Sequence, residues 1–251
     1  MAIPSKALKD INKCFAERVK YSRLNTIETS YLIKEVTSVC KKYKIMISPS
    51  IIIEMRDTFI YLLSKTKGTM AHRLGDSIIL DYKSKMPILD IALKYELPPM
   101  AVINQILIET KHESHKIEKI IKKQTLPKDI HLEEIMKVDP LFWFPCNIPN
   151  IHGKLNKLKC EYKLKYDLKK MGKCPDILFI NKCSYKRKSF TWIVFKPYIL
   201  FDSPLHIHDI QKTINNFSRF GPGLILYNDI ICSKSFIRKL DVYVDTYAFF
   251  D

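Results

Sequence analysis

Residues 174–196 read CPDILFINKCSYKRKSFTWIVFK, and this stretch decides the fold expected for the C-terminal part of the chain. It contains two runs of β-branched and aromatic residues, 177–180 and 190–195, of the kind that forms buried strands. Residues 181–184 between the two runs predict a turn. The stretch therefore predicts a β-hairpin that begins on a Pro-Asp pair and ends on a lysine.

The segments on either side of the hairpin extend this prediction to an α+β arrangement. Residues 152–173 contain eight lysines and only two acidic residues. Their apolar side chains recur at helical spacing, which predicts an amphipathic helix with a lysine-rich outer face. After the hairpin we expect a helix over 207–220, then a tight turn and a strand at 224–227, with a further strand at 242–244. Residues 151–251 are therefore expected to form an α/β domain around a central mixed sheet.

This order of elements resembles the core of the PD-(D/E)xK metal-dependent phosphodiesterases. In such enzymes an Asp at the start of one strand and an acid on the neighbouring strand hold Mg²⁺, a hard cation that prefers oxygen ligands. The metal activates water, and a lysine two residues after the second acid stabilises charge on the phosphate. By this resemblance Asp176 is the first acid and metal ligand, and Lys196 is the lysine.

Three stretches resemble one particular family of this type, the Codanin-interacting nucleases, which carry a Thr-Pro-Asp motif. They are CPDIL at 174–178, WIVFK at 192–196 and RFGPGLILY at 219–227. The helical part of the chain also resembles that family around 88–92 and 106–109. The resemblance implies an N-terminal helical region with helix–turn–helix character and a C-terminal nuclease-like domain. It further implies Codanin as a partner, a nuclear and cytoplasmic location and a role in erythroid differentiation.

The chain departs from the family motif at the second acid. Where the family has Trp-Ile-Glu-x-Lys, this sequence has Val194, and a valine offers Mg²⁺ no oxygen. Residues 152–155 bring His and Lys near the place of the family's preceding glutamates, and Cys174 replaces the leading Thr. A lone Asp176 beside Lys196 is expected to form an ion pair rather than hold a metal. We therefore expect a catalytically weakened or inactive nuclease-like protein with no cofactor, or with Mg²⁺ if it is active.

Two other acids keep an active enzyme open as the alternative. Asp202 lies six residues beyond Lys196, and Glu161 lies on the predicted preceding helix. Either carboxylate would serve as a relocated ligand if the backbone brought it to Asp176. The plainer interpretation of Asp202 is a turn residue before Ser203.

Candidate contacts to nucleic acid are the side chains of Gln211, Lys212, Arg219, Lys186, Arg187 and Lys188. The first two lie on the predicted helix, whose plainer interpretation is a solvated face. The arginine precedes the glycines of residues 221–223, which predict a tight turn with unusual φ values. The run 186–188 lies in the predicted hairpin connection, where it is either a solubilising tip or a phosphate contact.

His206 and His208 form the remaining candidate for a metal site, since a strand would place both imidazoles on one face. No cysteine or third histidine lies nearby in sequence. Asp209, which follows the pair, is a candidate cap for the next helix. We therefore favour a local structural role for these residues.

The N-terminal part, residues 1–138, has apolar residues at helical spacing. Residues 87–110 have the spacing of a helix–turn–helix, and the second helix would expose Asn104, Gln105 and Lys111 to DNA. The plainer alternative is an ordinary helical hairpin. Residues 139–150 contain three prolines among bulky aromatics, which predicts a packed junction between the two parts.

Composition narrows the class of partner. The 251 residues include 42 Lys and Arg against 26 Asp and Glu, a net charge of +16, which points to a polyanion, and to nucleic acid before acidic lipid. No run approaches the roughly 18 apolar residues of a membrane helix, and the first residues lack the apolar region of a secretion signal. Seven cysteines without a C-x-x-C indicate reduced thiols rather than a disulfide framework.

Overall fold

The computed structural model describes residues 3–17, 19–109, 132–145, 155, 158–168, 172–232 and 234–250. Its contacts divide the chain into two compact units. Unit 1 comprises Met1–Cys14, Ile33–Met55 and Pro145–Asp251, and unit 2 comprises Phe15–Leu32 and Arg56–Phe144. The expected helical region 1–138 thus contributes to both units, because its segments 1–14 and 33–55 belong with the C-terminal residues.

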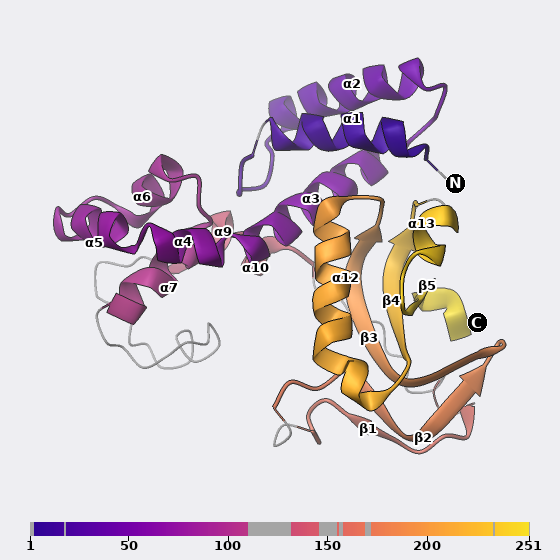
Figure 1. Cartoon of the computed structure of the whole chain (residues 1–251). Helices are drawn as coiled ribbons and strands as arrows, with labels where there is room; N and C mark the ends of the chain where they lie inside the picture. The colour runs from indigo at the N-terminus through magenta and orange to yellow at the C-terminus, as the bar shows by residue number, and fades with distance from the viewer. Residues whose placement is uncertain are drawn as a thin grey trace. The chain divides into compact units, whose positions relative to one another are not determined.

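Helices account for the N-terminal part of the chain, as the apolar spacing predicts (Figure 1). They are α1 (Ser5–Ala16), α2 (Thr26–Lys42), α3 (Pro49–Thr66), α4 (Gly68–Arg73), α5 (Gly75–Lys83), α6 (Ile88–Lys94), α7 (Pro99–Glu109), α9 (Leu132–Val138) and α10 (Pro140–Trp143). Three of them begin on a proline, which lacks an N–H that the first turn could not use anyway. The buried Asp139 caps α10 by accepting from the Leu141 N–H at 3.0 Å.

Most residues of the helix α7 lie in the core of unit 2. Its buried residues pack with those of α5 and α6 in one apolar cluster. Gln105, expected to be exposed, is 2% exposed and donates to the Glu109 carboxylate at 3.1 Å. A helix that is apolar on nearly all sides is buried on nearly all sides, so the predicted exposure of Gln105 was wrong. Asn104 is half-buried, and Lys111 lies outside the described residues.

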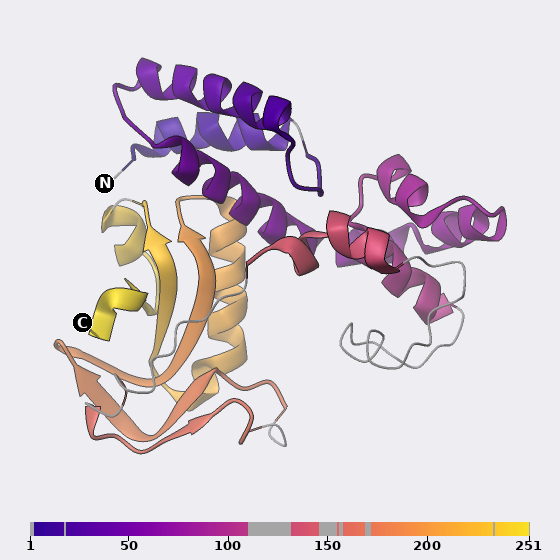
Figure 2. The ribbon, with the colours of Figure 1, turned by 180° about the vertical axis from the view of Figure 1, so that it is seen from behind.

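The C-terminal residues form a mixed five-stranded sheet in the order β1-β2-β3-β4-β5 (Figures 1 and 2). The strands are β1 (Tyr162–Leu164), β2 (Ile177–Tyr185), β3 (Lys188–Leu200), β4 (Gly223–Ile230) and β5 (Tyr243–Thr246). The pairs β1–β2 and β2–β3 are antiparallel, and the pairs β3–β4 and β4–β5 are parallel. Between β3 and β4 the chain forms α12 (Pro204–Phe217) and η3 (Ser218–Phe220); α13 (Lys234–Arg238) and η4 (Tyr247–Phe250) flank β5. The α+β class and the mixed sheet are thus confirmed.

The hairpin between β2 and β3 is longer than predicted. Residues 181–184 continue β2, because Cys183 is fully buried and pairs with Phe190 on β3. The turn consists of Lys186 and Arg187, with φ of 46° and 63°. Two residues with positive φ match the right-handed twist of the strands in a two-residue hairpin.

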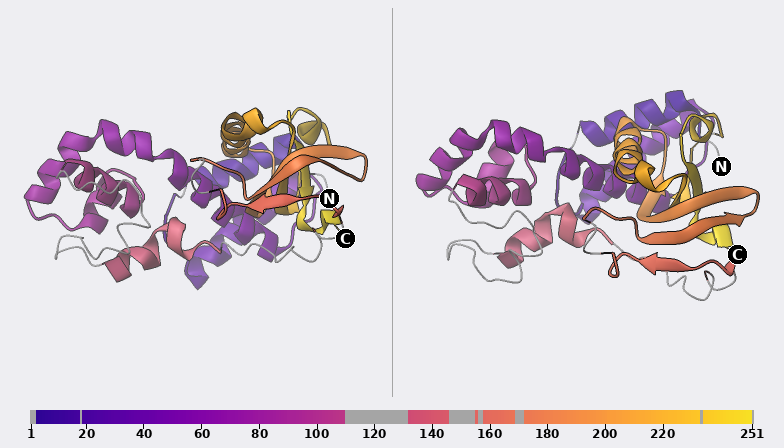
Figure 3. Two further views of the ribbon diagram at one scale, coloured as in Figure 1. Left: turned by 90° about the horizontal axis from the view of Figure 1, so that it is seen from below. Right: turned by 60° about the horizontal axis from the view of Figure 1, so that its bottom comes forward.

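Residues 162–164 form the edge strand β1, where a helix was predicted (Figure 3). Tyr162 and Leu164 are half-buried, whereas Lys163 between them is exposed. This alternation is the two-residue period of a strand, and Tyr162 pairs with Phe179 on β2. Residues 162–164 therefore pair with the edge of β2 as a strand, although the apolar spacing of the lysine-rich segment is helical.

The two faces of the sheet have different coverings. One carries the apolar cluster of unit 1, which includes Ile177, Ile193 and Leu224. The other is covered by α12, whose Phe217 ring lies 5.6 Å from that of Trp192 (Figures 1 and 2). Trp192, Val194 and Lys196 alternate with the core residues of β3 and therefore face α12.

Gly223 at the start of β4 is a position where a side chain has no room, since a Cβ there would overlap the buried Trp192 indole. We expect Gly223→Ala to lower the free energy of unfolding by about 1–3 kcal/mol through overpacking. Urea denaturation measures it. Gly68→Ala is the control, because a Cβ at Gly68 meets nothing within 4 Å. Equal stability of the two variants would contradict this account of the packing.

Candidate functional site

The pairing of β2 with β3 places Val194 across from Asp176. Ile177 pairs with Ile193 and Leu178 with Trp192, so the next position in this register joins Asp176 to Val194. The Asp176 Oδ2 atom accepts a hydrogen bond from the Phe195 N–H at 2.8 Å. This bond holds the carboxylate against β3. Asp176 therefore lies across from a hydrocarbon side chain rather than from a second acid.

The second oxygen of Asp176 faces a lysine other than the expected one. Lys165, which follows β1, donates from Nζ to Asp176 Oδ1 at 3.4 Å. The Asp176 side chain is 20% exposed and that of Lys165 is 66% exposed. Such an exposed pair contributes little to stability. The predicted ion pair between Asp176 and Lys196 was wrong, because Lys196 is held by a different carboxylate.

Lys196 belongs to a buried polar network under α12. Its Nζ lies 2.7 Å from Asp209 Oδ2 and donates to Thr213 Oγ1 at 2.9 Å. The Tyr198 hydroxyl donates to the same Asp209 oxygen at 2.5 Å. The Lys196 and Asp209 side chains are only 12% and 14% exposed. Because these groups come from β3 and α12, the network fastens the helix to the sheet.

The buried His206 uses both ring nitrogens within the fold. Its Nε2 lies 2.9 Å from the Ile199 carbonyl and its Nδ1 lies 2.8 Å from Ser203 Oγ. A carbonyl only accepts, so Nε2 carries the hydrogen and Nδ1 accepts from the hydroxyl. Burial lowers the pKa of His206 to about 4. His208 is exposed on α12, so these histidines do not form a metal-binding pair.

The cap of α12 is Ser203, whose side chain accepts from the His206 N–H. Asp209, the candidate cap, instead lies inside the helix.

The candidate substitute acids lie far from Asp176 along the strands. Asp202 follows β3, and its carboxylate accepts from the Ser5 hydroxyl at 3.1 Å. From Val194 to the end of β3 is six residues, roughly 20 Å at the usual strand rise. The carbonyl of Glu161 accepts from the Ile180 N–H, four residues along β2 from Asp176, or roughly 13 Å. The structure therefore does not bring either acid to the site.

Three exposed cations surround the segment that leads into β2, and we call them the cationic rim: Lys165, Lys173 and Arg219. Arg219 donates to the Lys173 carbonyl at 2.9 Å, and Lys165 pairs with Asp176. The Arg219 guanidinium lies 4.7 Å from the centre of the Phe220 ring. Of the rim, sequence reasoning identified only Arg219. The other two were assigned to the outer face of a predicted helix, whereas Lys165 follows β1 and Lys173 lies in the non-helical segment before β2.

The other predicted nucleic-acid contacts are dispersed. Gln211 and Lys212 are exposed on α12. Lys186 donates to the Phe249 carbonyl at 2.6 Å, and Lys188 pairs with Asp245 at 2.8 Å. These two lysines therefore fasten the C-terminal segment to the hairpin, and Arg187 is exposed at its tip.

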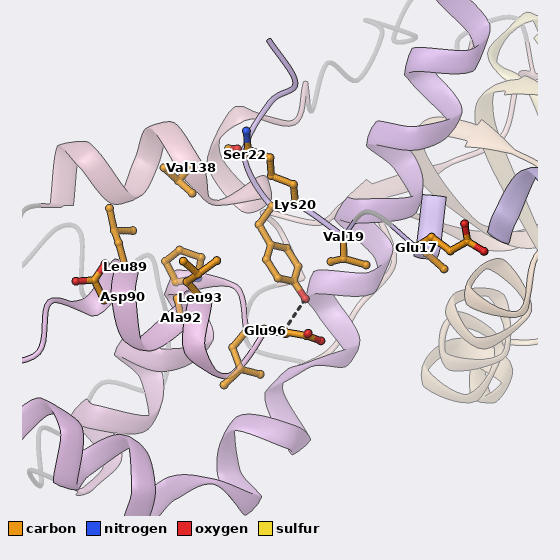
Figure 4. A pocket seen from close by; sticks show the side chains of 14 residues that line it. Glu17, Val19, Lys20, Ser22, Leu89, Asp90, Ala92, Leu93, Glu96 and Val138 are labelled. Carbon is orange, nitrogen blue, oxygen red and sulfur yellow. Dashed lines mark hydrogen bonds between the residues drawn. The ribbon is translucent and has the colours of Figure 1, made fainter. Parts of the chain in front are cut away.

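Unit 2 contains a pocket of about 560 Å³ that sequence reasoning missed (Figure 4). Leu89 and Leu93 of α6 line it together with Tyr21, whose hydroxyl donates to the Glu96 carbonyl at 3.2 Å. The exposed carboxylates of Asp90 and Glu96 also belong to its lining. The one signal in the sequence is a leucine on the polar side of α6: Leu93 is 80% exposed.

Fold and site together define an α+β protein in which a β-hairpin presents one carboxylate beside a valine and a cationic rim. No family model, curated protein or solved structure matches the chain. Among the residues described, no three His, Cys, Asp or Glu side chains gather where they could hold a metal ion. None of the described helices has the length and apolar character to cross a membrane.

Proposed function

We propose that this protein binds nucleic acid through a nuclease-like domain without hydrolysing it by the metal-dependent route. The observation that carries the proposal is the position of Val194 directly across from Asp176. The α+β order of a hairpin, a crossover helix and a parallel strand is the order that the nuclease resemblance implies. Codanin binding, a nuclear and cytoplasmic location and a link to erythroid differentiation rest on that resemblance alone.

The residues at this position do not fit Mg²⁺. The ion needs several oxygen ligands at 2.0–2.1 Å, of which one or two are usually carboxylates. Asp176 is the one acid that the hairpin contributes here, and its oxygens already accept from Phe195 and Lys165. The motif lysine, Lys196, is bound to Asp209. These residues therefore do not support hydrolysis through a bound metal.

The cationic rim supports binding to a phosphate backbone. Its three side chains are exposed and lie at the end of the hairpin where nuclease chemistry would otherwise occur. The net charge of +16 favours any polyanion at long range. In the cationic rim, two lysines and one arginine outnumber the side chains that read base edges. We therefore expect the binding of nucleic acid to have weak sequence preference.

Fluorescence anisotropy with labelled single-stranded, duplex and branched DNA tests the proposal. The triple variant Lys165→Ala, Lys173→Ala, Arg219→Ala is expected to raise the Kd about 10-fold or more. It should reduce the slope of log K against log salt by about 3, one counterion per lost phosphate contact. The charge-matched control is Lys34→Ala, Lys41→Ala, Lys83→Ala, which removes three exposed lysines elsewhere and should keep most of the affinity.

The same DNA incubated with Mg²⁺ or Mn²⁺ provides the second readout. We expect no cleavage above that of the Asp176→Ala variant. Metal-dependent cutting by the wild type that this variant loses would overturn the proposal in favour of an active phosphodiesterase. If the affinity does not depend on salt, or if the control triple weakens it equally, the cationic rim is not the nucleic-acid-binding surface.

A further inference from the structure

Two cysteine sulfurs lie in direct contact at the edge of the sheet. The Sγ atoms of Cys160 and Cys183 are 2.9 Å apart, although the residues are 23 positions apart in sequence. This separation is roughly 0.9 Å longer than an S–S bond. Cys160 comes two residues before β1, and Cys183 lies on β2 opposite Phe190. The pairing of β1 with β2, continued by the Ile180 N–H bond to the Glu161 carbonyl, therefore brings the two thiols together.

The two thiols differ in their access to solvent. Cys183 is fully buried in the apolar cluster of unit 1, whereas Cys160 is half-buried against that cluster. Burial, and then the neighbouring Cys160 thiol, raise the pKa of Cys183 to about 12. The Cys160 sulfur also contacts the Leu158 carbonyl at 3.2 Å. An oxidant from solvent therefore reaches Cys160 first, and Cys183 is placed to react with the product.

We propose that Cys160 and Cys183 form a reversible disulfide when the protein meets a peroxide. The Cys160 thiolate attacks one oxygen of hydrogen peroxide, forming an S–O bond while the O–O bond breaks. The departing hydroxide takes up a proton as water, and Cys160 becomes a sulfenic acid. The Cys183 sulfur then attacks the Cys160 sulfur and loses its proton, the S–O bond breaks, and a second water leaves. Two thiols are oxidised by two electrons while one peroxide is reduced to two waters.

The disulfide would tether β1, which is the short edge strand of the sheet. β1 has three residues and, among the strands that the structure describes, pairs with β2 alone. A covalent link beside Tyr162 holds this strand against β2 and removes conformations from the unfolded chain. This consequence concerns stability, so it can be tested whether or not the protein binds nucleic acid.

The test oxidises the full-length protein with hydrogen peroxide, blocks remaining thiols under denaturing conditions and maps the peptides by mass spectrometry. A linked peptide pair containing Cys160 and Cys183 is expected. The Tm should rise by about 6–10 °C, the effect expected for a loop of this length in a chain of this size. Dithiothreitol should reverse both changes.

Cys160→Ser is the main variant, because its side chain is only half-buried and the change leaves the core intact. It should abolish the linked peptide and the rise in Tm. Cys174→Ser is the matched control, since this buried cysteine lies between Cys160 and Cys183 in the sequence. This variant should form the linked peptide as the wild type does. Cys183 that remains open to alkylation after peroxide treatment would overturn the proposal, as would a linked pair formed by other cysteines. A linked peptide without a rise in Tm would overturn the tethering of β1.

Discussion

Replacing Lys196 with methionine is expected to lower the free energy of unfolding by about 3–5 kcal/mol, because it leaves the Asp209 carboxylate buried without its cation. The two charged groups are 2.7 Å apart and their side chains are 12% and 14% exposed. Thr213 and Tyr198 complete the network around them. A lysine kept only for catalysis would cost little stability when replaced. The expected loss therefore separates a structural role from a catalytic one.

The double variant Lys196→Met, Asp209→Leu should recover most of this loss, since it removes both buried charges together. Lys165→Met is the control for an ion pair whose lysine is exposed, and it should cost less than about 1 kcal/mol. Urea denaturation followed by circular dichroism measures all three variants. If Lys196→Met destabilises the protein no more than Lys165→Met does, the pair of Lys196 and Asp209 does not fasten α12 to the sheet.

Acidification from pH 7 to pH 4 is expected to remove about 3 kcal/mol of stability through His206 alone. Burial lowers the pKa of this histidine to about 4 in the folded protein, against about 6.5 in an unfolded chain. Between these values the unfolded chain binds a proton that the folded protein does not. The contribution is therefore complete above pH 6.5 and is lost progressively as the pH falls towards 4.

The comparison with His206→Gln isolates this contribution from that of the carboxylates, which both proteins share. The amide of glutamine keeps a donor for the Ile199 carbonyl but does not titrate. We expect the variant to be less stable than the wild type at pH 7, with a flatter dependence of unfolding free energy on pH between 6.5 and 4. Parallel curves for the two proteins would contradict a neutral, buried imidazole.

The hairpin illustrates how far local sequence patterns reach. The runs 177–180 and 190–195 are dense in β-branched and aromatic residues, and both form strands that pair with each other. The turn was misplaced because Asn181 and Ser184 are turn formers by type. Cys183 between them is buried against the core, and a single well-packed side chain outweighs two weak turn preferences.

The partners of the site residues were beyond the sequence for a different reason. Asp176 and Lys196 were expected to pair because the motif places them close together. Asp176 instead binds the Phe195 N–H and Lys165, while Lys196 reaches Asp209 on α12. A charged side chain pairs with whichever opposite charge the packing of helix on sheet brings within reach. Spacing along the chain carries no information about that choice.

Composition, periodicity and residue type alone were enough to predict an α+β chain of high positive charge and a hairpin that begins on a Pro-Asp pair. These features are local: each depends on a few consecutive side chains and their preferences. The contact between Cys160 and Cys183, the edge strand β1, the burial of Gln105 and the pocket beside α6 arise only when distant segments pack. These features are stabilised by contacts between surfaces that meet only when the chain folds, so the tertiary structure alone determines them.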